Sequence, residues 1–237
     1  MLIAEAPADA QIARELADRV LREDKDWLNA ELLDEMRSWR GVDPTTTFTS
    51  WAGASKLPKA YTGFRKRVVS DYDAVAAQRV LGHLIAQALK NPTDAVIFVR
   101  DLDKREADQR KASLERVASK NKDITLRIVL ALPRAKREAW VLNGFEPCSE
   151  EEKRALKAER QRLGFNPCTE AHQLDAQPDQ AQKNAKRALH KLTGSAPTRE
   201  AACWQDTSLD TLRKRGEKTG LKAYLDAVKK HLQLITS

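Results

Sequence analysis

Short apolar runs separated by longer amphipathic stretches dominate the chain as far as residue 135. The clearest run spans residues 95–99, Ala-Val-Ile-Phe-Val, and its length and β-branched content predict a buried strand. Residues 1–4 and 124–132 predict two further strands. Elsewhere apolar residues recur every three or four positions, which is the spacing of a helix with one buried face. The helices predicted on this basis cover residues 27–39, 73–90, 106–119 and a segment that begins at Asp9.

The order of these elements and their breaks predict the fold class. Strand, helix and strand follow one another, which predicts a crossover connection and a parallel sheet. Residues 42–63 are rich in Thr, Ser, Gly and Pro and predict a long loop with room for a short strand. From residue 136 onward the pattern is helical, with breaks at 144–149, 164–167, 177–178 and 194–197. We therefore expect an α/β fold, with a parallel-rich sheet flanked by helices over 1–145 and a helical C-terminal region over 146–237.

The charge is concentrated near the C-terminus. The chain has 42 Lys and Arg against 34 Asp and Glu, a net charge of +8. Residues 181–237 carry twelve of the basic and five of the acidic residues, so this segment holds +7 of that total. Such a concentration predicts an acidic partner, either nucleic acid or an acidic protein surface. Lys186 and Arg187 are the candidate phosphate contacts, and no base-recognition motif accompanies them.

The sequence argues against several classes of protein. No run of about 18 apolar residues is present and the N-terminus lacks the pattern of a secretory leader, so we expect a cytoplasmic protein with no membrane span. The chain has three cysteines, Cys148, Cys168 and Cys203. An odd number of widely spaced cysteines argues against a disulfide framework and a zinc site. The chain also has no GxxxxGK[ST] motif, so any response to ATP must come from a partner.

Carboxylates follow each of the three predicted strands. Glu5 follows the first, Asp101 and Asp103 follow the second, and Glu138 comes shortly after the third. The carboxyl ends of parallel strands meet at one edge of a sheet, where ligands bind in open α/β folds. Asp101 and Asp103 can face one hard cation, because alternate residues of an extended segment point the same way. Mg²⁺ or Mn²⁺ held there would polarise a phosphoryl oxygen and orient an attacking water.

Three segments resemble motifs of one family. LIAEAPAD at residues 2–9 is similar to the strand and following glutamate of the Toprim fold, and VIFVRDLD at 96–103 is similar to its Asp-x-Asp. REAWVL at 137–142 resembles a glutamate motif of small Toprim-like defence proteins, and 164–167 and 184–187 are loosely similar to these proteins too. Toprim domains occur in topoisomerases, primases and nucleases of the overcoming-lysogenization-defect type. The resemblance covers residues 1 to about 145 by motif, and Ala6 stands where the family commonly has Gly.

The resemblance implies a metal-dependent nuclease acting on DNA or RNA, the effector of an anti-phage system that a partner ABC-type or related ATPase controls. It also favours a chain that has little activity until it is released or assembled, as a homo-oligomer. Glu5 would be a metal ligand or a general acid or base. Asp9 would support Glu5 without contacting the metal itself. The four metal-site and catalytic residues would be Glu5, Asp101, Asp103 and Glu138, and the phosphate contacts beside the Asp pair would be Arg100, Lys104 and Arg105.

Structural roles compete with each of these assignments. Glu5, Asp9 and the Asp pair could cap helices, because acidic groups near a helix N-terminus are favoured. Glu138 has basic neighbours and could form a surface ion pair, and the basic residues around the Asp pair could be a solvated charge run. At the level of function, the alternatives are a catalytically inactive binding or regulatory module of an ATPase complex and a nucleotidyl- or phosphoryl-transferring enzyme.

Aromatic and apolar residues outside these motifs also allow two interpretations. Trp39, Trp51 and Trp204 could stack on bases, although isolated tryptophans are more typical of a core. A helical stripe near the C-terminus could contact a partner or pack on the chain's own core. Its residues are Leu221, Tyr224, Leu225, Val228, Leu232 and Ile235.

Overall fold

The computed structural model describes residues 1–58, 71–90, 92–102, 107–121 and 125–233. The chain divides into two compact units, each built from more than one segment. The first unit comprises Met1–Arg100, Glu106–Ala131 and Ala227–Ser237, and the second comprises Asp101–Arg105 and Leu132–Asp226. Asp103, Lys104 and Arg105 lie outside the described residues.

A four-stranded, all-parallel sheet forms the centre of the first unit, in the order β2-β1-β3-β4. The apolar run at 95–99 is strand β3, as predicted, and four of its five residues are buried. Buried strands of this kind follow from a parallel sheet covered by helices on its faces. The strands are β1 (Leu2–Ala4), β2 (Thr49–Ser50), β3 (Ala95–Val99) and β4 (Arg127–Ala131).

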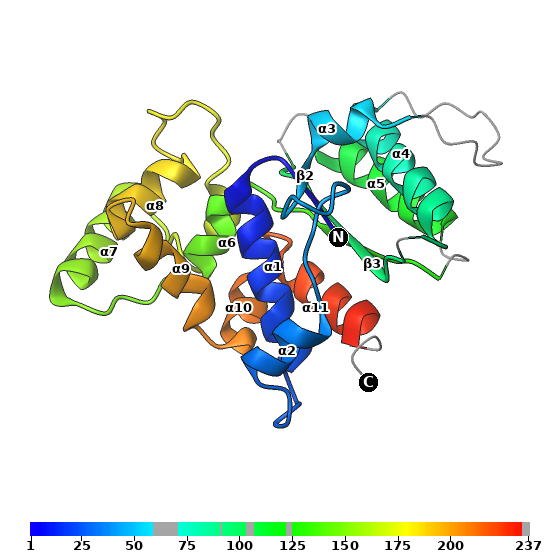
Figure 1. The fold of residues 1–237 in the computed structure, drawn as a ribbon. Coiled ribbons are helices and arrows are strands. Elements are labelled where there is room, and N and C mark those ends of the chain that lie inside the picture. Colours follow the sequence, from blue (N-terminus) through cyan, green and yellow to red (C-terminus); the bar gives the residue numbers. More distant parts are fainter. Residues whose placement is uncertain (59–70, 91, 103–106, 122–124, 234–237) are drawn as a thin grey trace. The chain divides into compact units, whose positions relative to one another are not determined.

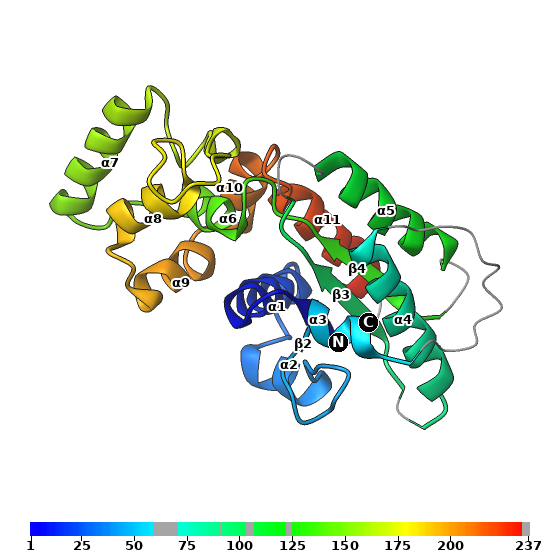
Figure 2. The ribbon, with the colours of Figure 1, turned by 90° about the horizontal axis from the view of Figure 1, so that it is seen from above.

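Helices cover this sheet on opposite faces (Figures 1 and 2). The helices α4 and α5 lie side by side on one face, and α1 packs against β1 and β3 on the other. The apolar stripe predicted for α1 is buried, including Ile12, Leu16 and Val20. The helices wholly within this unit are α1 (Pro7–Arg22), α2 (Ala30–Met36), α3 (Trp51–Lys56), α4 (Tyr72–Gln87) and α5 (Ala107–Lys120).

Two local predictions in this unit were wrong. The helix predicted over 27–39 is confined to α2, and it ends where the guanidinium of Arg37 binds the carboxylate of Asp18 at 2.6 and 2.9 Å. Within the predicted loop 42–63 the chain forms not only the short strand β2 but also the helix α3. Ser50 caps α3 by accepting a hydrogen bond from the backbone N–H of Gly53.

The second unit is helical, and its helices are separated at the predicted breaks. The buried helix α6 lies at its centre, where the Trp140 indole donates to the Thr219 carbonyl at 2.9 Å and stacks on Tyr224. The further elements are α7 (Glu150–Leu163), the short 3-10 helix η1 (Ala171–Gln173), α8 (Ala185–Thr193), α9 (Pro197–Gln205) and α10 (Leu209–Arg215), after α6 (Arg137–Asn143).

Close approach of two segments in this unit requires a glycine. A Cβ built on Gly144, just after α6, would lie 1.9 Å from the carbonyl oxygen of Cys203 in α9. No larger residue fits there without moving the backbone. The Cys203 side chain is buried beside this contact, and burial raises the pKa of its thiol to about 12.

The last helix, α11 (Leu221–Leu232), carries the apolar stripe noted in the sequence. Five of the six residues of that stripe are at most 3% exposed, and Ile235 lies outside the described residues. These five side chains therefore belong to the core, and they do not offer a surface to a partner. Trp51 and Trp204 are likewise buried, so they are core residues and not exposed stacking platforms.

Candidate functional site

The carboxyl edge of the sheet in the first unit brings a predicted glutamate beside a predicted arginine. Strands β1 and β3 pair in parallel with Ile3 opposite Phe98, so Glu5 and Arg100 follow at matching positions. The Nη1 group of Arg100 donates to Oε2 of Glu5 at 2.6 Å. Strand β2 lies on one side of β1 and β3 on the other, so this pair lies at the point where the strand order reverses. In open α/β sheets that point is the usual place for a ligand.

A second carboxylate, which the sequence did not indicate, lies behind this pair. Asp73 is in the first turn of α4, and its side chain is 2% exposed. Its Oδ2 accepts hydrogen bonds from Nε of Arg100 at 2.9 Å and lies 3.0 Å from Nε of Arg110, a residue of α5. Arg100 therefore bridges the exposed Glu5 and the buried Asp73. We refer to Glu5, Asp73, Arg100 and Arg110 as the edge cluster.

The other oxygen of Asp73 is buried and has no hydrogen-bond partner among the residues that the structure describes. A buried acceptor without a donor is rare, because it loses its bonds to water and gains none. Burial raises the pKa of Asp73, while the guanidinium groups of Arg100 and Arg110 act in the opposite direction by favouring the anion. Oδ1 is thus an acceptor with unused capacity, held beside two cations at the edge of the sheet.

An aromatic ring supports the arginine. Trp51, the first residue of α3, donates its indole N–H to the carbonyl of Val99 at 2.7 Å, at the end of β3. Its ring centroid lies 5.8 Å from the guanidinium carbon of Arg100. A cation over an aromatic face is attracted by the ring quadrupole, so this contact helps to fix the arginine in place.

The Asp pair follows the arginine in the chain. Asp101 is half-buried and belongs to the second unit, as does Leu102. The backbone N–H of Leu102 donates to the carbonyl of Pro133 at 2.8 Å, and Leu102 forms a parallel bridge with Arg134. Backbone pairing thus ties Leu102 to the segment that follows β4. Asp103 lies outside the described residues.

Glu138 lies in the first turn of α6 in the second unit, with its side chain 15% exposed. One of its oxygens accepts a hydrogen bond from Arg137 at 3.3 Å, and Arg137 also lies 3.7 Å from Glu200 of α9. The ion pair considered from the sequence is therefore formed. This pair neutralises the Glu138 carboxylate, which stays partly exposed.

The remaining predicted residues have clear local roles. Oδ2 of Asp9 accepts a hydrogen bond from the backbone N–H of Ala6 at 3.0 Å, which caps α1. Ala6 itself is extended, with φ at −138°, a conformation that does not require glycine. In α8, Lys186 is exposed, whereas the half-buried Arg187 donates to the carbonyl of Gln180 at 2.7 Å.

Hard oxygen atoms are the ligands that a divalent ion such as Mg²⁺ prefers. Among the residues that the structure describes, no group of three or more His, Cys, Asp or Glu side chains is placed to hold a metal. Magnesium needs only one or two carboxylates, with waters completing its shell. In the first unit Glu5 supplies a hard oxygen donor, and Oδ1 of Asp73 is an acceptor without a partner in the described part of the chain. Asp101 is a carboxylate of the second unit. The chemistry of these donors therefore fits Mg²⁺ or Mn²⁺.

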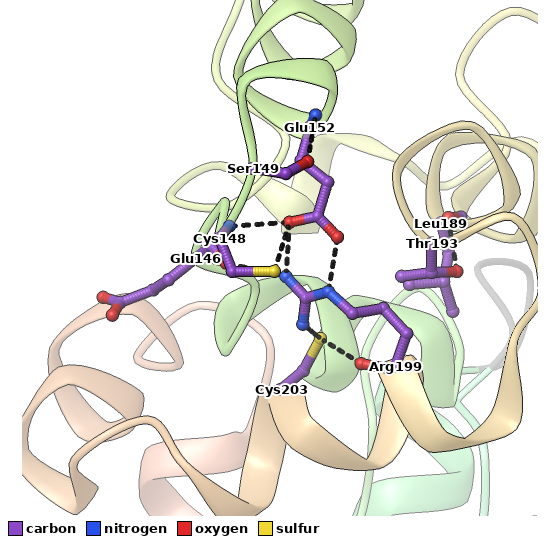
Figure 3. Close-up of polar contacts among 8 residues, drawn as sticks. All are labelled: Glu146, Cys148, Ser149, Glu152, Leu189, Thr193, Arg199 and Cys203. Carbon is purple, nitrogen blue, oxygen red and sulfur yellow. Dashed lines mark hydrogen bonds and ion pairs between the residues drawn. The ribbon is translucent and has the colours of Figure 1, made fainter.

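A separate polar cluster joins α7 to α9 in the second unit (Figure 3). Arg199 donates to both oxygens of Glu152, from Nε at 2.6 Å and from Nη2 at 3.0 Å. Glu152 also accepts from the backbone N–H and the thiol of Cys148, at 2.7 and 3.2 Å. The hydrogen bonds from Arg199 are the main reason that the pKa of Glu152 is lowered to about 2. This carboxylate is fully engaged in holding two helices together.

Low pH should lower the free energy of unfolding by protonating Glu152 in this cluster. The pKa of Glu152 is about 2 when folded and 4.5 ordinarily, so its contribution to stability is present above pH 4.5 and is lost as the pH falls toward 2. We expect Glu152→Gln to lower the free energy of unfolding by about 1–2 kcal/mol at pH 6, since solvent screens part of the interaction, and by less than about 0.5 kcal/mol near pH 2. Urea unfolding at both pH values measures this, with the exposed Glu151→Gln as control. Equal losses at the two pH values would contradict the assignment.

No family model matches this chain, and neither a curated protein nor a solved structure does. Among the described residues, no helix has the length and apolar character needed to cross a membrane.

Proposed function

We propose that this chain is a Toprim-like nuclease that hydrolyses phosphodiester bonds of DNA or RNA with a divalent metal ion. One observation supports this above the others. Glu5 and Arg100 face each other at 2.6 Å at the carboxyl edge of a parallel sheet, at its switch point. Asp101 is the next residue after Arg100, so an acid follows each of the two central strands. A carboxylate-rich edge of this kind suits a metal-assisted reaction at phosphate.

In this proposal Glu5, Asp101, Asp103 and Glu138 hold Mg²⁺ or Mn²⁺. Such an ion, when bound, polarises a phosphoryl oxygen and orients the attacking water. Glu5 is 57% exposed, so it can also receive a proton from water or return one to the leaving oxygen. Asp9 supports the turn after β1 through its bond to Ala6 and does not take part in the chemistry.

Arg100 is the residue of the edge cluster best suited to bind the phosphate. Its Nε and Nη1 are occupied by Asp73 and Glu5, and among the described contacts its Nη2 has no partner. The Arg100 side chain is 16% exposed and its guanidinium lies over the ring of Trp51, so its orientation is set before a substrate arrives. A planar guanidinium fixed in this way binds phosphate oxygens with defined geometry. Lys104 and Arg105 are the further phosphate contacts that we propose near the Asp pair.

The second candidate function is a binding or regulatory module without catalysis. The same ion pair favours it, because Arg100 neutralises Glu5 and can replace a cation beside it. In either case we propose an ATPase partner and a homo-oligomer as the means of control, since the chain itself has no ATP-binding P-loop motif.

The test is a cleavage assay with a separate binding readout. Purified full-length chain is incubated with single-stranded DNA, double-stranded DNA or RNA in Mg²⁺, Mn²⁺ or EDTA, alone and with a candidate partner ATPase. We expect cleavage with either ion and none in EDTA. Mn²⁺ binding is measured independently by calorimetry. Binding of Mn²⁺ without cleavage under any condition would favour the regulatory module, and absence of both would overturn the metal site.

A further inference from the structure

The second unit contains a pocket whose walls carry mostly positive charge. Its volume is about 480 Å³, and it lies between α7, the segment after α6 and the end of α10. Three of its cations are Lys153, Lys157 and Arg160, at positions that share one face of α7. The fourth is Arg215, the last residue of α10, and Glu146 is the one carboxylate in the lining.

One of these cations is held in a defined orientation. Nη1 of Arg215 donates to the carbonyls of Asn143 and Phe145 at 3.2 and 3.3 Å, and Nη2 donates to Glu146 at 3.0 Å. The side chain is 23% exposed, so it borders the pocket without extending into solvent. Its carboxylate partner Glu146 is more exposed, at 56%. An arginine fixed in this way loses little conformational entropy when an anion binds.

Two further cations have unused capacity. Lys157 and Arg160 are exposed, and within the described part of the chain neither has a carboxylate within ion-pair distance. Lys153 is paired with Glu150 on the same helix, at 2.7 Å. Because the one carboxylate of the lining is engaged by Arg215, the pocket keeps an excess of positive charge.

An amide group adds a neutral donor. Oδ1 of Asn166 accepts from the backbone N–H of Cys168 at 3.1 Å, so the Asn166 Nδ2 group remains available as a donor at the lining. The buried side chain of Asn143 donates to the Cys168 carbonyl at 3.0 Å and holds the same loop. Burial raises the pKa of the Cys168 thiol to about 12, so this cysteine is not a nucleophile there. The lining is therefore suited to binding and not to covalent chemistry.

We propose that this pocket binds the phosphate group of a nucleotide, either free or at the end of a nucleic-acid strand. Two guanidinium groups, two ammonium groups and an amide donor match the oxygens of a phosphate better than those of a single carboxylate. A volume of about 480 Å³ exceeds what one phosphate needs and is of the size that a nucleotide occupies. The apolar side chains of Pro147 and Leu156 at the lining can contact the sugar or base. All of these residues belong to the second unit, so the proposal does not depend on the metal site.

A matched pair of charge reversals on α7 tests the proposal. Arg160→Glu reverses a cation of the pocket, and Arg154→Glu makes the same change at an exposed arginine of the same helix outside the lining. Full-length wild type and both variants are titrated with AMP, a 5′-phosphorylated ten-nucleotide DNA strand, the same strand without its 5′-phosphate, and a polyglutamate peptide. Circular dichroism confirms that each variant is folded.

We expect Arg160→Glu to weaken binding of a phosphate-bearing probe about tenfold or more, and Arg154→Glu to change it less than about twofold. If Arg160→Glu weakens the binding of AMP, the pocket is a nucleotide site. If it weakens only the binding of the 5′-phosphorylated strand, the pocket is a site for the end of a strand. Either result supports the pocket. Equal weakening by both variants, binding of polyglutamate as tight as that of the phosphate probes, or no binding of any probe would overturn it.

Discussion

Replacing Asp101 or Asp103 with alanine should reduce metal-dependent cleavage to the background measured in EDTA. Each aspartate is proposed to supply an oxygen to the same ion, so removal of either one takes away a ligand and moves the ion from the position at which it polarises the phosphate. The fold should be retained, because two neighbouring carboxylates repel each other when no metal is present. We therefore expect an unchanged or slightly higher melting temperature. Cleavage and Mn²⁺ binding are measured on the same preparations.

The control for this prediction is Asp108→Ala. Asp108 is an exposed residue in the first turn of α5, and its replacement makes the same change in charge a few residues further along the chain. Its cleavage rate and Mn²⁺ affinity should match those of the wild type. Full activity of both Asp101→Ala and Asp103→Ala, in Mg²⁺ and separately in Mn²⁺, would show that the Asp pair does not hold the metal.

Loss of the Asp73 carboxylate should strongly lower the stability of the fold. Its side chain is 2% exposed and binds two arginines whose side chains are 16% and 14% exposed. Asp73→Ala leaves these guanidinium groups without their buried counter-charge, and breaking a buried ion pair from one side is strongly destabilising. We expect the free energy of unfolding at neutral pH to fall by about 3 kcal/mol. Urea unfolding followed by circular dichroism measures this change.

Glu5 provides the matched comparison, because it binds the same arginine from a solvent-exposed position. Its side chain is 57% exposed, so Glu5→Ala should lower the free energy of unfolding by less than about 1 kcal/mol. The same variant should lose metal-dependent cleavage if Glu5 holds the ion. Similar stability losses for Asp73→Ala and Glu5→Ala would show that burial does not distinguish the two carboxylates.

Much of the fold could be predicted from the sequence, since it depends on local patterns. The run at 95–99 is apolar throughout, as expected of a strand covered on both faces, and four of its five residues are buried. The amphipathic spacing of Ile12, Leu16 and Val20 likewise requires a helix with one buried face. Where local signals were weak the predictions were wrong. The Thr- and Ser-rich segment before Trp51 gave no sign that this buried tryptophan begins a helix.

The sequence by itself determined that an acid or a base follows each central strand, because strand ends are visible in the hydropathy pattern. It identified Glu5 and Arg100, and the register of β1 and β3 then brought the two together.

Only the tertiary structure decided that Asp73 and Arg110 join Glu5 and Arg100. Asp73 has the sequence context of a helix start, and burial under two arginines comes from packing α4 beside α5. The charged pocket of the second unit has the same origin, since Arg160 and Arg215 are distant in sequence and meet at one cavity through the packing of helices. Contacts of this kind depend on the whole arrangement of helices, which no local pattern records.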